Sequence, residues 1–262
     1  MTDWLDLCRA CVADVRRVLD ELPTRHEREP VVGAGLGGDD TTAVDKAAED
    51  AILARLRTLD DVAVVSEEIG RFGDGATLIV VDPIDGSLNA KRGIPFFAVS
   101  IAVADGTRMG DVHFGYVYDF GSGEEWVARR GGGATLNGEP MTMRPKETIE
   151  ILGFEATRSS LIARDAPKVA DLAYRLRVMG SLALSLCHLA AGRMDAVCSL
   201  KGARSVDIAA AQLLVREAGL AIALFDDSRA FEEAELDLEG RSRVVAAGTP
   251  DLCKQIANAL SA

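Results

Sequence analysis

The chain has 262 residues, 48% of them hydrophobic and 27% charged, which is enough apolar material for one large folded domain or two halves that share an interface. Its 41 acidic residues against 29 Lys and Arg give a formal net charge of −12, which argues against general binding to nucleic acid or to an anionic membrane. To bind an anionic substrate, the site would therefore need metal ions or clustered basic side chains that offset the negative charge of the protein.

The N-terminus, Met-Thr-Asp-Trp, has neither a basic start nor an apolar core, and no apolar run approaches the length of a membrane span. We therefore expect a cytoplasmic protein without a secretory signal. Cys8 and Cys11 form a C-x-x-C pattern on the apolar face of a predicted helix. This position favours buried structural thiols over a redox pair.

The first part of the chain, residues 1–145, predicts helices followed by an antiparallel sheet. The predicted helices cover 2–22, which Pro23 ends, and 43–59; the predicted strands cover 62–65, 78–81, 96–103, 111–118, 124–128 and 133–136. The last two strands make a hairpin, for which Asn137-Gly138 is the turn signal. Residues 33–38 match G-x-G-x-x-G, but no strong strand precedes them, so we expect a mobile loop there.

The second part, residues 146–262, alternates strands and helices as an α/β half does. The predicted strands cover 149–156, 177–179, 195–200, 221–224 and 244–247, and the predicted helices cover 161–175, 181–191, 206–219 and 250–260. No long linker separates the two parts. We therefore expect a mixed α+β and α/β protein in which the second half completes a site that begins in the first.

The most informative stretch is Leu78–Asn89, where an apolar strand ends in two carboxylates, Asp82 and Asp85. Two carboxylates in a poorly solvated corner repel each other unless a cation lies between them, and Mg²⁺ prefers such oxygen ligands. The following Gly86 and Ser87 begin a predicted helix, whose free N–H groups suit a phosphate. A metal site and a phosphate site should therefore adjoin.

Another predicted strand, 62–65, also ends in acids, Glu67 and Glu68. If it lies beside the strand that ends at Asp82, at least three carboxylates meet. These acidic segments, together with several others, resemble the sequence motifs of the inositol monophosphatase family. The resemblance is greatest to the archaeal type, which acts on both fructose 1,6-bisphosphate and inositol 1-phosphate. The matching segments are Asp82-Pro-Ile-Asp85-Gly-Ser-Leu-Asn89, Ser66-Glu67-Glu68, Val44-Asp45-Lys46, Gly180-Ser181, the Gly192–Asp207 region, Val206-Asp207 and Arg216-Glu-Ala-Gly219.

The resemblance implies a layered α-β-α-β-α sandwich and Mg²⁺-dependent hydrolysis of phosphate monoesters by in-line attack of an activated water. It implies two or three Mg²⁺ ions, with Mn²⁺ as a substitute, and a homodimer. The implied metal ligands are Glu67, Asp82, the carbonyl of Ile84, Asp85 and Asp207, with either Asp39 or Asp40 near a third ion. The implied catalytic residues are Glu67, Ser87 and Asp45, and the implied phosphate ligands are the amides of Gly86 and Ser87.

The implied substrate contacts are Gly180, Ser181, Lys201, Arg204 and Arg177. Leu200 stands where inositol-specific members carry a carboxylate, and its basic neighbours favour a substrate with a second phosphate. Hydrolysis of fructose 1,6-bisphosphate to fructose 6-phosphate is therefore expected ahead of hydrolysis of inositol 1-phosphate. Alternatives are a nucleotide 3′-phosphatase, an NADP phosphatase, or a non-catalytic sensor of sugar phosphates.

Overall fold

The computed structural model describes residues 2–36, 40–155, 158–226 and 229–262. The helices are α1 (Trp4–Glu21), α2 (Arg25–Arg28), α3 (Ala43–Leu56), α4 (Ser87–Arg92), α5 (Ser159–Asp165), α6 (Leu182–Ala190), α7 (Ser205–Glu217) and α8 (Pro250–Ser261), with 3₁₀ turns η1 (Met109–Asp111), η2 (Ala166–Val169) and η3 (Phe231–Glu233). The strands are β1 (Val31–Ala34), β2 (Asp40–Thr42), β3 (Val62–Ser66), β4 (Gly70–Phe72), β5 (Thr77–Asp85), β6 (Ala98–Ala104), β7 (Val112–Asp119), β8 (Glu125–Arg129), β9 (Gly133–Leu136), β10 (Glu139–Pro140), β11 (Ile149–Glu155), β12 (Ala173–Arg177), β13 (Ala196–Ser199), β14 (Ala221–Leu224) and β15 (Val244–Ala247).

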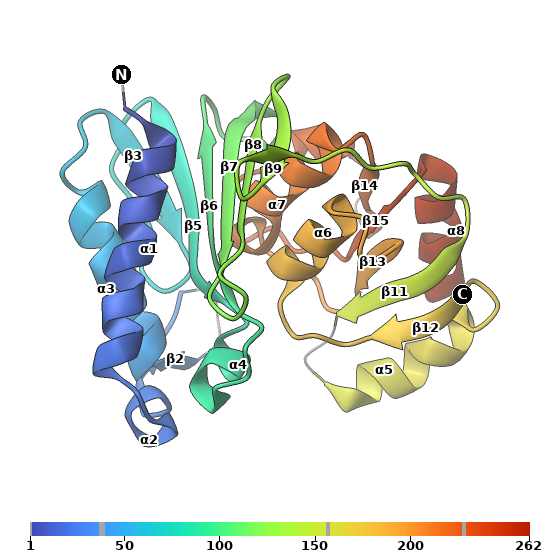
Figure 1. Ribbon diagram of the computed structural model, residues 1–262, viewed down its shortest axis with the longest axis horizontal. Coiled ribbons are helices and arrows are strands. Elements are labelled where there is room, and N and C mark those ends of the chain that lie inside the picture. The colour runs from blue at the N-terminus through green and yellow to red at the C-terminus, as the bar shows by residue number, and fades with distance from the viewer. Residues whose placement is uncertain (1, 37–39, 156–157, 227–228) are drawn as a thin grey trace.

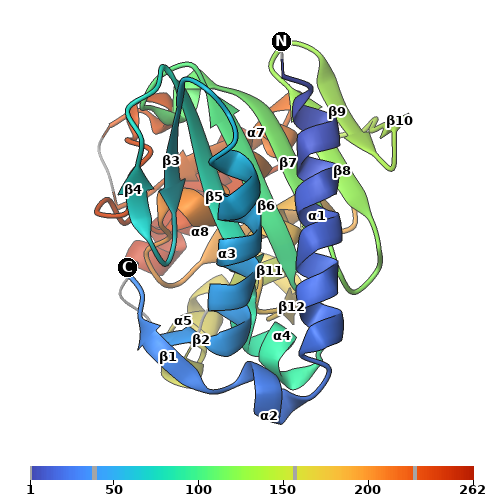
Figure 2. The same cartoon turned by 90° about the vertical axis from the view of Figure 1, so that its left-hand side faces the viewer.

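These elements stack in five layers, which confirms the predicted sandwich (Figure 1). Helices α1 and α3 lie side by side over the outer face of an eight-stranded sheet of order β10-β9-β8-β7-β6-β5-β3-β4 (Figure 2). Helices α6 and α7 lie between this sheet and a five-stranded sheet of order β12-β11-β13-β15-β14, whose far face α5 and α8 cover (Figure 1). None of the helices in the described part of the chain has an apolar stretch long enough to cross a membrane.

Each interface between layers is filled by apolar side chains that the sequence places at helical or strand spacing. Cys8, Cys11 and Val15 on α1 face the sheet and are buried. Helix α1 begins after Asp3, whose carboxylate accepts hydrogen bonds from backbone N–H groups of the first turn. All five cysteines are buried free thiols, and burial raises the pKa of Cys11 to about 12, which confirms the structural role expected for the C-x-x-C pair.

The structure differs from the sequence prediction at residues 161–175, which are not one helix. Helix α5 ends at Asp165, a 3₁₀ turn containing Pro167 follows, and Ala173–Arg177 is strand β12. Strand β12 pairs in parallel with β11, Ile149 opposite Ala173, and forms the edge of the five-stranded sheet. The proline interrupts the helical hydrogen bonds, and pairing with β11 then decides the conformation of a segment whose own pattern is ambiguous.

Two details of the first half also differ from the prediction. Asn137 and Gly138 have positive φ angles, as a tight turn requires, but their turn joins β9 to β10, whereas residues 130–132 join β8 to β9. Residues 31–34 and 40–42 form a small antiparallel pair of strands where a loop was expected, and Gly37, Gly38 and Asp39 lie outside the described residues.

Candidate active site

The first carboxylates meet because β3 and β5 are parallel neighbours. Ser66 lies opposite Val81. Glu67 and Asp82 are the next residues in the chain, so they lie side by side at the same end of this strand pair. The predicted sheet was antiparallel throughout, and this one parallel pair is what brings the two acidic strand ends together. The expectation that acids from both strands gather at one place is therefore confirmed.

A bulge in β5 places Asp82 and Asp85 on the same face of the sheet. Residues three apart on a regular strand point to opposite faces. Here Asp82 lies opposite Ser100 and Asp85 opposite Ala98, so three residues of β5 span two residues of β6. Pro83 lies in this bulge, where its missing N–H does not break the ladder. Both carboxylates consequently face the layer of α6 and α7.

The second half of the chain holds Asp85 from the other side. One of its oxygens accepts hydrogen bonds from the Ala183 N–H at 2.7 Å and from the Ser181 hydroxyl, both at the start of α6. The segment before α6 is fixed in turn by Glu155, which accepts from the Gly180 N–H at 2.9 Å and the Ser185 hydroxyl at 2.6 Å. The carboxylate of Glu155 therefore positions the residues that orient Asp85.

Asp85, Glu155 and Gly180 line a cavity of about 750 Å³ between the two halves. The predicted site residues that line it are Asp40, Asp45, Glu67, Asp82, Ile84, Asp85, Gly86, Ser87, Gly180, Lys201, Arg204 and Asp207. Asp39 lies outside the described residues. Ser181 does not line the cavity, but its hydroxyl donates a hydrogen bond to Asp85, which does. Arg177 is exposed, does not line the cavity, and donates to the carbonyl of Leu176.

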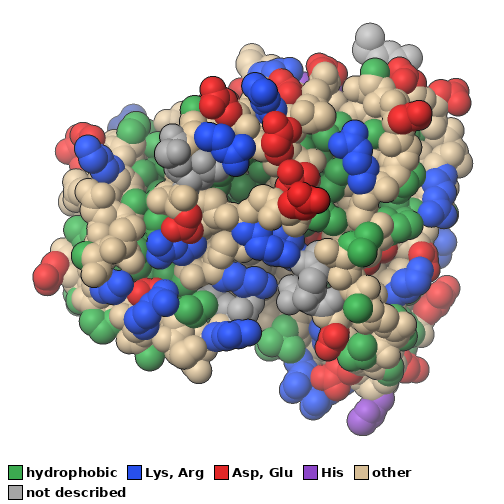
Figure 3. All heavy atoms as spheres, turned by 180° about the vertical axis from the view of Figure 1, so that it is seen from behind, with side chains coloured by type: hydrophobic (Ala, Val, Ile, Leu, Met, Phe, Trp, Pro, Cys, Tyr) green, Lys and Arg blue, Asp and Glu red, His purple; other side chains and the backbone are tan. Residues whose placement is uncertain are grey.

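The cavity also contains residues that the sequence analysis did not single out, among them Glu155, Arg158 and Lys91. Glu155 is the last residue of β11, so it shows the same signal as Glu67, an acid where a buried strand ends. Leu200 does not line the cavity but is buried in the apolar layer between the five-stranded sheet and its outer helices. Lys and Arg side chains gather near the middle of the face seen from behind (Figure 3).

Asp45 and Ser87 both line the cavity, but Ser87 is not the donor to the Asp45 carboxylate in this structure. One oxygen of Asp45 accepts from the backbone and hydroxyl of Thr42, as the third residue of α3 does in a capping box. Lys91 places its ammonium 3.9 Å from the same oxygen. The other oxygen of Asp45 is buried without a hydrogen-bond partner in the described part of the chain.

Burial, reinforced by mutual repulsion, disfavours ionisation of the acids in this cavity. Burial, reinforced by the charges of Glu67, Asp85 and Asp207, raises the pKa of Asp82 well above its ordinary value. Burial also raises the pKa of Glu67 to about 7, although the guanidinium of Arg204 opposes that rise. The pKa of Asp85 is likewise raised to about 7, mainly by burial. The site therefore has a strong electrostatic need for positive charge.

This donor set fits a hard divalent cation. Carboxylate oxygens are the ligands that Mg²⁺ prefers, and a dication bound between these carboxylates would stabilise their ionised forms, which burial and mutual repulsion disfavour. As the side chains stand, however, no three acidic, His or Cys residues within the described part of the chain converge closely enough to hold a metal. Two of the acids, Glu67 and Asp207, are instead engaged by Arg204, at 2.6 and 3.1 Å from its Nη2. The chemistry of the site fits a metal, and its ligands need a rearrangement to bind one.

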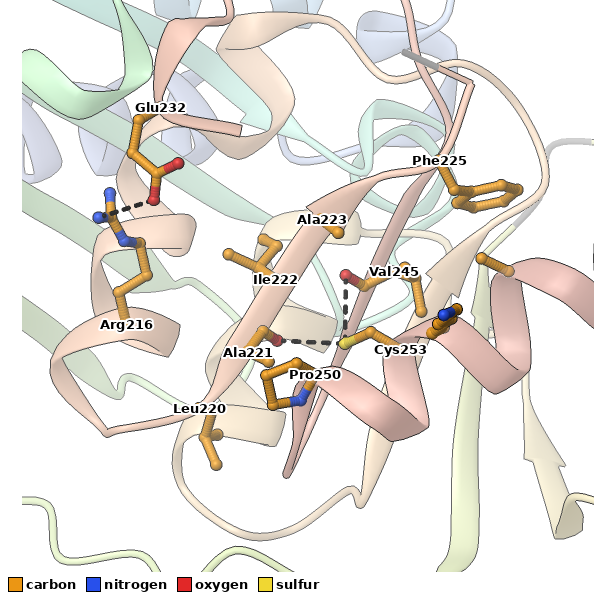
Figure 4. A pocket seen from close by; sticks show the side chains of 12 residues that line it. Arg216, Leu220, Ala221, Ile222, Ala223, Phe225, Glu232, Val245, Pro250 and Cys253 are labelled. Carbon is orange, nitrogen blue, oxygen red and sulfur yellow. Dashed lines mark hydrogen bonds and ion pairs between the residues drawn. The ribbon is translucent and has the colours of Figure 1, made fainter. Parts of the chain in front are cut away.

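A second cavity, of about 460 Å³, lies between β14, α7 and α8 and is lined mainly by apolar side chains (Figure 4). Its charged lining residues are Arg216, Glu232 and Lys254, and Arg216 forms an ion pair of 3.1 Å with Glu232. A single carboxylate that is already paired offers neither a metal site nor a general base. The cavity that contains Glu67, Asp82, Asp85 and Asp207 is therefore the candidate active site.

Comparison with known proteins finds relatives over nearly the whole chain. Residues 7–262 match the model of the inositol monophosphatase family. Relatives include proteins named fructose-1,6-bisphosphatase/inositol-1-monophosphatase from Archaeoglobus fulgidus, 34% identical over 94% of this chain and 93% of that protein, and from Thermococcus kodakarensis, 37% identical over 87% of this chain and 86% of that protein. A crystal structure of an inositol monophosphatase–fructose 1,6-bisphosphatase has a TM-score of 0.87 at 28% identity and covers 99% of this chain and 100% of its own. The chain belongs to the inositol monophosphatase family.

Proposed function

We propose that this chain is a Mg²⁺-dependent phosphatase of sugar phosphates, which hydrolyses fructose 1,6-bisphosphate to fructose 6-phosphate in preference to inositol 1-phosphate. The observation that carries the proposal is the meeting of Glu67, Asp82, Asp85 and Asp207 in one cavity that also contains the first turn of α4. Names of relatives from two archaea support both substrates.

The acids divide into two overlapping ligand sets. Glu67, Asp82 and the carbonyl of Ile84 would hold one ion, and Asp82, Asp85 and Asp207 would hold a second. Two or three bound Mg²⁺ ions, or Mn²⁺ in their place, would neutralise charge on the phosphate oxygens and make a water molecule easier to deprotonate. All five residues line the same cavity, which supports their assignment as metal ligands.

Phosphate would be received by the backbone amides of Gly86 and Ser87. Gly86 has φ 89° and precedes the first helical residue of α4, so the N–H groups that follow are not used within the helix. Glu67 would orient or deprotonate the attacking water together with the hydroxyl of Ser87. The oxygen of Asp45 without a partner is available to polarise that hydroxyl, and Asp40 would lie near a third ion.

A second phosphate on the substrate would be met by basic side chains of the cavity. Lys201 and Arg204 line it from the second half, and Arg158 adds a third positive charge. Gly180 would shape the wall beside them, and Ser181 would act through the hydrogen bond that its hydroxyl donates to Asp85. Two phosphates demand more positive charge than one, so this composition supports a bisphosphate over inositol 1-phosphate.

Release of inorganic phosphate with Mg²⁺ tests the proposal. The substrates are fructose 1,6-bisphosphate, inositol 1-phosphate, NADP and a nucleotide 3′-phosphate, and we expect the highest kcat/KM for the first. Lys201→Met should raise KM for fructose 1,6-bisphosphate more than KM for inositol 1-phosphate, whereas Arg177→Met, outside the cavity, should change neither. Absence of turnover on all four while Mg²⁺ binds would leave the sensor as the better explanation.

We also propose that the protein is a homodimer. Four large apolar side chains near α4 and β12 are at least 45% exposed: Leu88, Ile94, Tyr174 and Val178. The two segments adjoin, because the Asn89 amide donates to the carbonyl of Met179 at 2.8 Å. Exposed apolar side chains that gather in this way are typical of an interaction surface. Light scattering after size exclusion should give the dimer mass, and Tyr174→Asp should shift it toward the monomer.

A further inference from the structure

Arg204 lies where a metal ion would be expected. It immediately precedes the first residue of α7, three residues before Asp207, and only 6% of it is exposed. Its Nη2 atom is 2.6 Å from Oε1 of Glu67, which follows β3, and 3.1 Å from Oδ1 of Asp207 on α7. One guanidinium therefore bridges two carboxylates that come from opposite sides of the cavity.

The surrounding acids hold this guanidinium firmly in its charged form. Burial alone would lower the pKa of Arg204, but the charges of Asp207, Glu67 and Asp82 raise it above its ordinary value. The backbone N–H of Arg204 also donates to the Asp207 carboxylate at 2.7 Å, which fixes the start of the side chain beside its partner. Arg204 is thus a built-in counter-cation for the acids of the site.

The guanidinium and a divalent ion compete for the same oxygens. Mg²⁺ binds oxygen ligands at about 2.0–2.1 Å, closer than the guanidinium nitrogen now approaches, and it demands near-octahedral geometry around itself. An ion bound to Oε1 of Glu67 at that distance would not leave room for Nη2 at 2.6 Å from the same oxygen atom. Binding of the ion to this oxygen must therefore displace the guanidinium from it.

We propose that Arg204 is the resident counter-cation of the metal-free site and that Mg²⁺ binding displaces it into the cavity, where it binds the anionic group of the substrate. This inference rests on the proposed metal-dependent function and deepens it. The displaced guanidinium keeps its charge and its planar fork of donors, which suits a phosphate. Metal and substrate binding are then linked, because the arginine is available to a substrate anion only after the metal has taken its place.

Calorimetric titration of the metal-free protein with Mg²⁺ at pH 8 tests the competition directly. Arg204→Met should lower the Kd for Mg²⁺ by about tenfold, within the range typical of coupled sites. Lys201→Met is the matched control, because it removes one positive charge from the same cavity without removing the bridge between Glu67 and Asp207. Its Kd should change much less. An unchanged or higher Kd for Arg204→Met, or an equal fall in both variants, would overturn the inference.

Thermal unfolding provides a second readout. In EDTA, Arg204→Met should unfold at a lower temperature than the wild type, because the acids have lost their counter-cation, and Mg²⁺ should then raise its Tm by more than it raises that of the wild type. Arg204→Lys keeps the positive charge but loses the planar guanidinium, and its Kd for Mg²⁺ should lie between those of the wild type and Arg204→Met. If Arg204→Met does not fold, a Kd for Mg²⁺ of Arg204→Lys equal to that of the wild type counts against the inference.

Neither readout uses turnover, so the two proposals can fail separately. The expected shift in Kd without phosphate release from any substrate would refute the phosphatase and keep the competition. Phosphate release with no shift in Kd would do the reverse.

Discussion

Replacing Asp85 with Asn should stabilise the metal-free protein at pH 8 while it abolishes phosphatase activity. Asn can present its carbonyl oxygen where Asp85 accepts from the Ala183 N–H and the Ser181 hydroxyl, so both hydrogen bonds can persist. The variant loses only the negative charge, which a metal needs and which the metal-free protein tolerates poorly. The fold should therefore remain intact as the reaction stops.

The magnitude follows from the pKa of Asp85, which is raised from its ordinary value of 3.8 to about 7. Above pH 7 the carboxylate is ionised in both states, and the folded state bears the full penalty of roughly 4 kcal/mol, at about 1.36 kcal/mol for each pKa unit. Well below pH 3.8 it is protonated in both states and the penalty vanishes. The free energy of unfolding of the wild type therefore falls as the pH rises from 3.8 toward 7, because the folded protein disfavours the ionised form of Asp85. At pH 5.5 the advantage of the variant should fall to roughly 2 kcal/mol.

Urea denaturation in EDTA at pH 8 and pH 5.5 measures this difference, and phosphate release measures activity. Asp119→Asn is the matched control: Asp119 is buried and accepts from the Gly121 N–H and the Ser122 hydroxyl, but it does not line the cavity. It should gain no stability. The reasoning is refuted if Asp85→Asn is less stable than the wild type at pH 8 in EDTA, or if it keeps a near-normal rate with Mg²⁺.

Three further outcomes are expected. Gly86→Ala should lower the free energy of unfolding, measured by urea denaturation, by about 1–3 kcal/mol and should reduce activity. The reason is that Gly86 has φ 89° and that a Cβ there would lie 3.1 Å from the carbonyl oxygens of both Gly180 and Phe96. Asn89→Ala removes two hydrogen bonds of 2.8 Å, to the carbonyls of Phe96 and Met179, and should cost about 1–3 kcal/mol while the Kd for Mg²⁺ stays the same; a large change in that Kd would contradict this role. All five cysteines should resist a thiol reagent such as DTNB in the native protein and react only in urea, because all are buried; fast reaction of any one would show that its element opens.

Sequence by itself identified the acidic residues that line the cavity. Asp82, Pro83 and Asp85 form one continuous motif, and the acid at 67 stands where an apolar strand ends, so charge repulsion alone pointed to a cation. Most helices and strands followed from their apolar spacing, because burial of one face imposes a period that the sequence carries locally. The prediction of one helix at 161–175 was wrong, because the end of this segment becomes a strand by pairing with β11, and that pairing is not encoded in the segment itself.

Tertiary structure alone decided how these residues meet. The bulge that puts Asp82 and Asp85 on one face depends on the register of β5 against β6, and the approach of Glu67 depends on the parallel pairing of β3 with β5. The bridge of Arg204 across the cavity is a contact between residues far apart in the chain. Spacing along a sequence records the period of an element, whereas register, strand direction and long-range contacts arise only when separate elements pack. This is why the acids that line the cavity could be predicted and the contact of Arg204 with Glu67 could not.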